Sequence, residues 1–102
     1  MSDASLDLLH YEDYAPHINS KFTAQFANGA TLDLELANVE EKSPSPRQEQ
    51  FILTFRGPRN GPREQQIFNL HHTQLGSGIM FLVPVGMDAN GLTYEAVFNR
   101  PK

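Results

Sequence analysis

The two adjacent histidines, His71 and His72, are the side chains whose type most readily suggests chemistry. Imidazole binds metal ions and exchanges protons near neutral pH. The flanking sequence is typical of a β-strand, on which neighbouring side chains point to opposite faces, so this pair cannot chelate one ion. A closed zinc site needs three or four convergent ligands, but His10 and His17 are far away in sequence and cysteine is absent. We therefore expect no metal site and no cofactor.

The loop at residues 88–91, Asp-Ala-Asn-Gly, begins like a calcium-binding loop. An EF-hand loop starting there needs glycine at its sixth position and glutamate at its twelfth, but those positions are Thr93 and Asn99. The pattern is instead typical of a hairpin connection, in which asparagine and glycine accept positive φ. We predict a hairpin loop without a bound ion.

Acidic side chains are the remaining candidates for acid–base chemistry. Asp33 and Glu35 lie on one face of a predicted strand, but catalysis by paired carboxylates needs a cleft, and no part of the sequence predicts one. The chain also lacks G-x-S-x-G, a phosphate-binding glycine loop and a cysteine nucleophile. The sequence leans against an enzyme, although a reaction carried out by other residues stays open.

Three arginines, Arg56, Arg59 and Arg63, form the only basic cluster, in the stretch RGPRNGPR. Arginine side chains on a loop at one end of a barrel can bind a phosphate or a carboxylate, which makes these residues a candidate anion site. The alternative is that they keep a loop rich in proline and glycine soluble. The net charge is −4 and aromatic residues do not interleave with the basic ones, so we expect no binding to nucleic acid.

The most apolar stretch, GIMFLVPVGM at residues 78–87, is apolar on both faces if it forms a strand. Alternate residues from Ile79 to Val85 share one face, which we expect to be the core. Met80, Leu82 and Pro84 share the other, and soluble monomers seldom expose three such side chains together. We expect the N-terminal segment, a second sheet or a partner protein to cover them. Those three residues are therefore the candidate partner-binding site.

Pro84 raises a separate question, because proline has no N–H to give to a sheet ladder. It belongs at an edge, at a bulge or at the end of a strand. Gly86 follows closely, which favours the strand end.

Six segments with a period of two predict the strands that position these residues. They are residues 21–27, 31–36, 51–57, 66–73, 78–87 and 92–99. Asn28-Gly29 is a strong hairpin signal between the first two, and the alternation slips after Leu36, which predicts a β-bulge near Ala37 or Asn38. Short connections leave no room for crossover helices, so we predict an all-β fold, antiparallel and mostly a meander. A small barrel or roll is preferred to a sandwich.

The first 18 residues differ from the rest and predict a short helical segment. Asp7 is placed to cap a helix from Leu8 to Tyr14, and Pro16 is expected to end it. We expect this segment to pack across an open end or face of the barrel. The chain would then be one domain, residues 1–102, with an N-terminal segment (1–18) and an antiparallel sheet (19–100).

The overall composition suits one soluble globular domain. The chain has 102 residues, of which 39% are hydrophobic, enough for one core. The N-terminus lacks the basic and apolar regions of a signal peptide, and no apolar run is long enough to span a membrane. Without cysteines, a cytoplasmic location is the default expectation.

Several motifs resemble a family of uncharacterised bacterial proteins of about this length. They are FRGP (55–58), LHHTQLGSGIMFLVPVG (70–86), NGLTYEAVFNR (90–100) and the opening LHYEDYAPHINSKF (9–22). The family carries FLVP(V/I)G followed by Y-E-A-V-F-N, and Gly-Ser-Gly at 76–78 departs from its usual pattern. The resemblance supplies no catalytic residue. It implies an accessory or assembly role beside phage-tail-collar-like fibre proteins.

Two functions remain open from the sequence. The first is a non-enzymatic interaction module that binds another protein or a second copy of itself through the face of Met80, Leu82 and Pro84. The second is a barrel that binds a small anion, or an uncharacterised enzyme, using a mouth lined by arginines and histidines.

Overall fold

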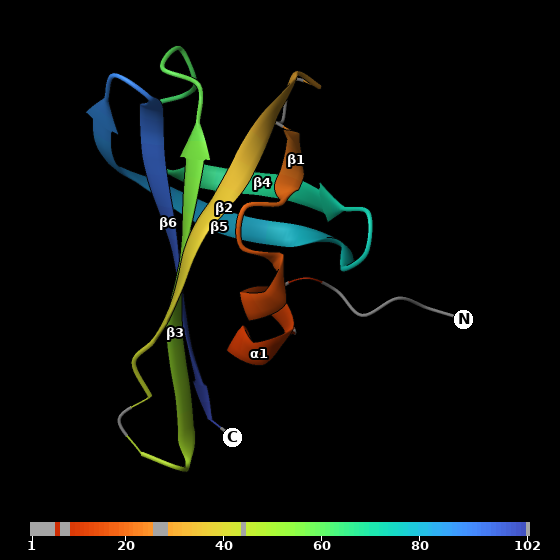
Figure 1. Cartoon of the computed structure of the whole chain (residues 1–102), viewed down its shortest axis with the longest axis vertical. Helices are drawn as coiled ribbons and strands as arrows, with labels where there is room; N and C mark the ends of the chain where they lie inside the picture. The colour runs from red at the N-terminus through yellow and green to blue at the C-terminus, as the bar shows by residue number, and fades with distance from the viewer. Residues whose placement is uncertain (1–5, 7–8, 26–28, 44, 102) are drawn as a thin grey trace.

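The chain forms a closed barrel of six antiparallel strands, preceded by a short helical segment (Figure 1). The computed structural model describes residue 6 and residues 9–25, 29–43 and 45–101. The strands are β1 (Lys21–Gln25), β2 (Thr31–Glu41), β3 (Gln48–Gly57), β4 (Gln66–His72), β5 (Gly76–Asp88) and β6 (Gly91–Pro101). They follow a helix, α1 (Tyr11–Tyr14), and a 3-10 turn, η2 (Ala15–His17). The predicted all-β fold is confirmed.

The order of the strands around the barrel is β1-β2-β3-β6-β5-β4, and β4 returns to β1. Each half of the chain is a meander, because β1 to β3 pair in sequence and so do β4 to β6. Two pairings between the halves, β3 with β6 and β1 with β4, close the ring. The expectation of a mostly sequential, antiparallel meander therefore holds within each half, and a barrel forms instead of a sandwich.

Strand β5 is shared between two neighbours (Figure 1). Its first part pairs with β4 as far as Leu82, and its second part pairs with β6 from Val83 onwards. Pro84 lies just beyond the β4 ladder, at a register shift between Pro84 and Gly86, and the strand continues to Asp88. The favoured position for Pro84, at the strand end, is therefore wrong, and the bulge, which was one of the three expected positions, is confirmed. The proline is tolerated because it sits at a bulge where β4 no longer needs its N–H.

Alternating side chains fill the barrel, as the period of two requires. The predicted inward sets on β2, β3 and β6 include Leu34, Phe51, Leu53, Tyr94 and Ala96, all of which are buried. The predicted bulge is present between Leu36 and Asn38. Strands β1 and β2 pair as the expected hairpin, and Gly29 has φ +90°. Asn28, and the residues at 26 and 27, lie outside the described part of the chain.

The N-terminal segment closes the end of the barrel where β3 begins and β6 ends. Tyr14 and Leu6 are buried in the core, and the Tyr14 ring centroid lies 6.1 Å from that of Phe51. The helix starts at Tyr11, later than predicted, because residues 9 and 10 are not helical; Asp7 and Leu8 lie outside the described residues. It ends at Tyr14 as predicted, but Pro16 continues in the 3-10 turn.

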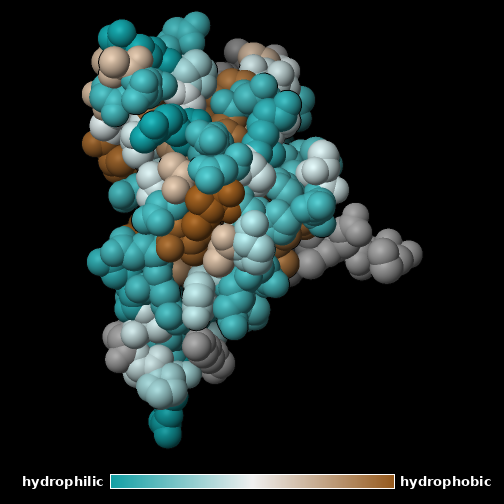
Figure 2. Space-filling view, in the orientation of Figure 1, coloured by the Kyte–Doolittle hydropathy of each residue, from teal (hydrophilic) through white to brown (hydrophobic). Residues whose placement is uncertain are grey.

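The face in Figure 2 is largely hydrophilic, with hydrophobic side chains gathered near its middle, where β2 passes in front of β5 in Figure 1. In the described part of the chain, no helix is long and apolar enough to cross a membrane.

Candidate interaction surface

His72 is a structural residue that holds the connection between β4 and β5. The backbone N–H groups of Gln74 and Leu75 both lie 3.1 Å from its Nδ1, which must therefore accept and carry no proton. Its Nε2 then donates to Ser20 Oγ at 3.0 Å, and Ser20 donates to the carbonyl of His17 at 2.5 Å. This is the wrong direction for a serine nucleophile, because the imidazole gives its proton to the hydroxyl.

The electrostatic surroundings of His72 agree with a neutral ring. Burial lowers the pKa of His72, and the neighbouring His17 and His71 lower it further. His71 points to the opposite, exposed face as predicted, with its Nδ1 2.8 Å from Ser77 Oγ. Among the described residues, no group of three histidine, aspartate or glutamate side chains is placed to hold a metal ion.

Of the three predicted anion-binding arginines, only Arg56 lines the surface hollow beside β2 and β3. This hollow has a volume of about 640 Å³, while Arg59 and Arg63 are exposed on the connection between β3 and β4. Asp33 and Glu35 line the same hollow as Arg56, and Glu35 lies directly opposite it on β2. The mixture of charges does not select an anion.

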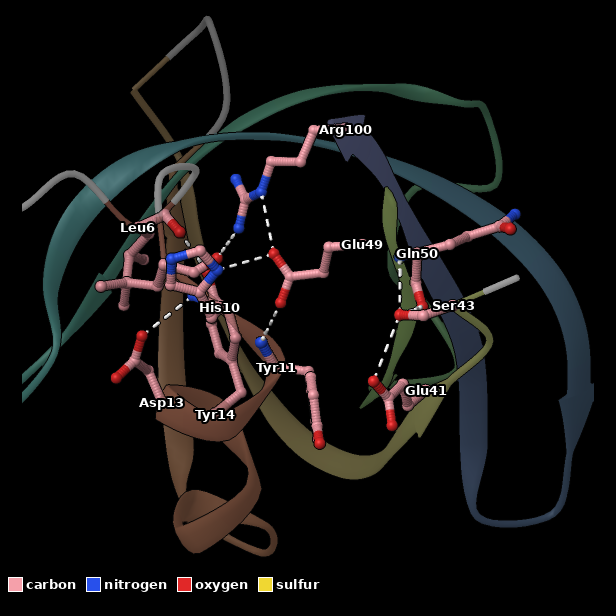
Figure 3. A network of polar contacts seen from close by, with 11 residues as sticks. Leu6, His10, Tyr11, Asp13, Tyr14, Glu41, Ser43, Glu49, Gln50 and Arg100 are labelled. Atoms are coloured by element: carbon pink, nitrogen blue, oxygen red, sulfur yellow. Dashed lines mark hydrogen bonds and ion pairs between the residues drawn. The ribbon is translucent and has the colours of Figure 1, made fainter. Parts of the chain in front are cut away.

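A buried carboxylate, Glu49, ties the N-terminal segment to the barrel (Figure 3). One of its oxygens lies 2.7 Å from His10 Nδ1 and 3.3 Å from Arg100 Nε, and the other accepts the backbone N–H of Tyr11. Arg100 also donates to the carbonyl of Leu9. Burial raises the pKa of Glu49, but the hydrogen bonds from His10, Tyr11 and Arg100 outweigh it and hold the pKa below its ordinary value.

This network was missed by the sequence analysis, although the period of two contains a signal for it. Glu49 precedes Phe51 on the inward face of β3, and Arg100 follows Phe98 on the inward face of β6. The two charged residues are directly opposite each other in the ladder. Extending both alternating patterns by one step would have placed this ion pair at the end of the barrel.

The two apolar faces of β5 are exchanged relative to the prediction. Met80 and Leu82 are only 4% and 0% exposed and point into the barrel, whereas Ile79 and Phe81 are 54% and 49% exposed. The expectation that Ile79 to Val85 form the core face is therefore wrong. The reason is the pairing with β4, which places Met80 opposite the buried Phe68. Met80 and Leu82 cannot meet a partner while the barrel is folded.

The outer face of β4, β5 and β6 carries most of the large apolar side chains that are exposed in the described structure. Ile67 lies directly opposite Phe81 in the β4–β5 ladder, and Ile79 is two residues away on the same face. Val97 is 60% exposed on β6, and Val85, at the register shift of β5, is 51% exposed. We call these five residues the outer apolar face.

A groove of about 360 Å³ lies between β5 and β6 within this region. Its walls include Ile79, Phe81 and Val97, and Glu95 lines it as well. The groove lies where the two strands have separated, because their pairing stops at Val83 and Glu95. Apolar side chains and unpaired strand edges therefore occur together.

Comparison with known proteins identifies the family but no characterised relative. No curated protein and no solved structure matches the chain. A family match covers residues 9–98. This range includes the helix, strands β1 to β5, all of β6 except its end, and every residue of the outer apolar face. The chain belongs to the family described as a domain of unknown function, DUF6916.

Proposed function

We propose that this domain is a protein-interaction module that binds its partner through the outer apolar face. The observation that carries the proposal is the exposure of Ile67, Ile79, Phe81, Val85 and Val97 on neighbouring strands. Apolar side chains gathered in this way are a common mark of interaction sites. The function predicted from the sequence is retained, while the contact surface moves to the other side of β5.

Other features of the domain favour a binding role over a catalytic one. The buried polar side chains Glu49 and His72 are engaged in holding the N-terminal segment and the β4–β5 connection. Arg56 faces Glu35, and the anion-binding alternative has no convergent set of donors to support it among the described residues. An accessory role beside phage-tail-like fibre proteins stays a prediction from the family resemblance.

The experiment is an affinity capture that compares three versions of the domain. Wild type, Phe81→Thr and a control, Ile18→Thr, are immobilised and exposed to extract from the native host. Ile18 is also an exposed apolar residue, 37% exposed, but it precedes β1 and lies outside the outer apolar face. Sedimentation velocity of the same three proteins tests self-association.

We expect a protein, or a second copy of the domain, to associate with wild type and with the control but not with Phe81→Thr. Circular dichroism and melting curves must first show that all three versions are folded. Equal retention of the same proteins by all three, together with equal sedimentation, would overturn the proposal.

A further inference from the structure

We infer that the occupant of the groove is an extended segment of a partner protein, which adds as a strand antiparallel to β5. The inference rests on the proposed function and specifies the partner's chemistry: alternating apolar residues with a lysine or arginine near Glu95. It is carried by the directions of the backbone groups on β5 and β6, together with the charge of the groove.

On β6, the backbone directions follow from contacts on the far side of β3. Successive residues of an antiparallel strand direct their N–H and C=O groups alternately to the two neighbours. Lys42 N–H donates to the carbonyl of Gln50 at 2.7 Å, so Gln50 is directed to β2. The next residue, Phe51, is therefore directed to β6 and bonds with its ladder partner Phe98. Val97, adjacent to Phe98, must then direct its N–H and C=O away from β3 and into the groove.

The same alternation determines the directions on β5. Glu95, two residues before Val97, is also directed to β5 and lies opposite Val83. Val83 is therefore directed to β6, and so are Phe81 and Ile79, at steps of two along the strand. Their side chains are the exposed ones, so the same residues offer both apolar surface and backbone groups.

Pro84 provides an independent check on these directions. As the neighbour of Val83, it must be directed toward the β4 side, where an N–H would have no partner. The β4 ladder ends at Leu82, so the missing N–H falls where no bond is made. If the backbone directions on β5 were shifted by one residue, the missing N–H of Pro84 would instead face β6, within the β5–β6 ladder.

The two edges are left unpaired by the separation of the strands. If the register at Val83 and Glu95 continued, Phe81 would lie opposite Val97 and Ile79 opposite Asn99. In the described chain neither pairing occurs. Unpaired strand edges bind extended peptides by adding a strand, with main-chain bonds giving affinity and alternate side chains giving specificity.

The charge of the groove selects the occupant. Glu95 is the charged residue that lines it, and no ion pair joins Glu95 to another described residue. A second copy of the domain offers the same carboxylate beside the same edges, so pairing of two copies leaves both acids without a counter-charge. A partner strand carrying lysine or arginine supplies that charge.

The probe is a displayed library of ten-residue peptides, selected on wild type and counter-selected on Phe81→Thr. We expect enriched peptides to alternate apolar residues and to carry lysine or arginine. The best peptide is then made with single N-methyl groups along its backbone. Methylation should weaken binding roughly tenfold at positions whose N–H faces β5 or the open edge of β6 at Val97, and it should change binding little at the ends of the peptide that lie beyond these edges. Glu95→Gln should weaken binding and reduce its dependence on salt.

Amide hydrogen exchange tests the same directions without relying on affinity. In the free domain the amides of Ile79 and Phe81 should exchange faster than those of Met80 and Leu82, and the peptide should slow the first pair. No enrichment over Phe81→Thr, equal effects of every N-methyl group, or protection of Ile79 and Phe81 in the free domain would overturn the inference. If a captured protein is lost with Phe81→Thr but is not displaced by the peptide, the strand inference fails and the proposed function stands.

Discussion

Replacing Glu49 by glutamine tests whether the buried carboxylate holds the N-terminal segment in place. The substitution preserves the size of the side chain and removes its charge. Glutamine offers one acceptor oxygen, and its amide nitrogen, itself a donor, must face a group whose hydrogen bond the carboxylate had accepted. Either the backbone N–H of Tyr11 or Nε of Arg100 then loses its hydrogen bond to residue 49.

The expected loss follows from the difference between charged and neutral hydrogen bonds. A bond to a charged group contributes about 1.5–3 kcal/mol and a neutral one about 0.5–1.5 kcal/mol. We count about 1 kcal/mol for each of the bonds from Tyr11 and Arg100, and nothing for His10, whose side chain is mostly exposed. The free energy of unfolding of Glu49→Gln should therefore fall by about 2 kcal/mol, with the melting temperature lower by roughly 10 °C.

Urea unfolding monitored by circular dichroism measures this loss. The matched control is Glu40→Gln, because Glu40 forms an ion pair with Lys42 at 3.2 Å in which both side chains are about half exposed. That change should cost less than about 1 kcal/mol. If Glu49→Gln unfolds within about 0.5 kcal/mol of wild type, the network does not stabilise the domain as argued.

The pH dependence of stability provides a second test of the role of Glu49. The folded pKa of Glu49 lies below its ordinary value of 4.5, so the unfolded chain takes up the proton first as pH falls. The stabilisation is fully present above about pH 4.5 and is lost as pH falls through the folded pKa. The difference in stability between wild type and Glu49→Gln should shrink as the pH is lowered over this range, and a constant difference would contradict the assignment.

Three further predictions concern other parts of the barrel. Gly91→Ala should prevent folding or cost several kcal/mol, since Gly91 has φ +138° and an added Cβ would lie 2.0 Å from a backbone oxygen of β3. The control is Gly86→Ala, whose added Cβ meets nothing within 4 Å. Equal melting temperatures of the two variants would refute this prediction. The pKa of His72 is lowered in the folded state, so its contribution to stability is present above about pH 6.5 and is lost as pH falls from there through the folded pKa. In urea titrations, His72→Gln should reduce the dependence of the free energy of unfolding on pH in this range. Leu82→Ala should lower the free energy of unfolding by about 2–5 kcal/mol, and Phe81→Thr by less than about 1 kcal/mol. The reverse order would show that Phe81 lies on the core face, as the sequence predicted.

The sequence predicts the parts of the fold where alternation has one apolar face. Leu53 and Phe55 alternate with Thr54 and Arg56, so the inward direction of this set follows from the sequence alone. On β5 both faces are apolar, and periodicity cannot say which points inward; only pairing with β4 decides. Glu49 and Arg100 were missed because a charged residue at an inward position breaks the expected pattern. The closing of the ring depends on pairing between strands that are distant in the chain.

The ring order also has a consequence for how the chain can be divided. The connection between β3 and β4 separates two three-stranded halves, each of which ends in strand edges that only the other half completes. A chain cut in this connection should therefore reassemble from its two fragments, as β3 recruits β6 and β1 recruits β4. A chain truncated before Gly91 would leave β3 and β5 with open edges instead, and such edges promote aggregation. The sixth strand thus pairs the edge of β3 and the second part of β5, and it leaves open only the edges that face the groove between β5 and β6.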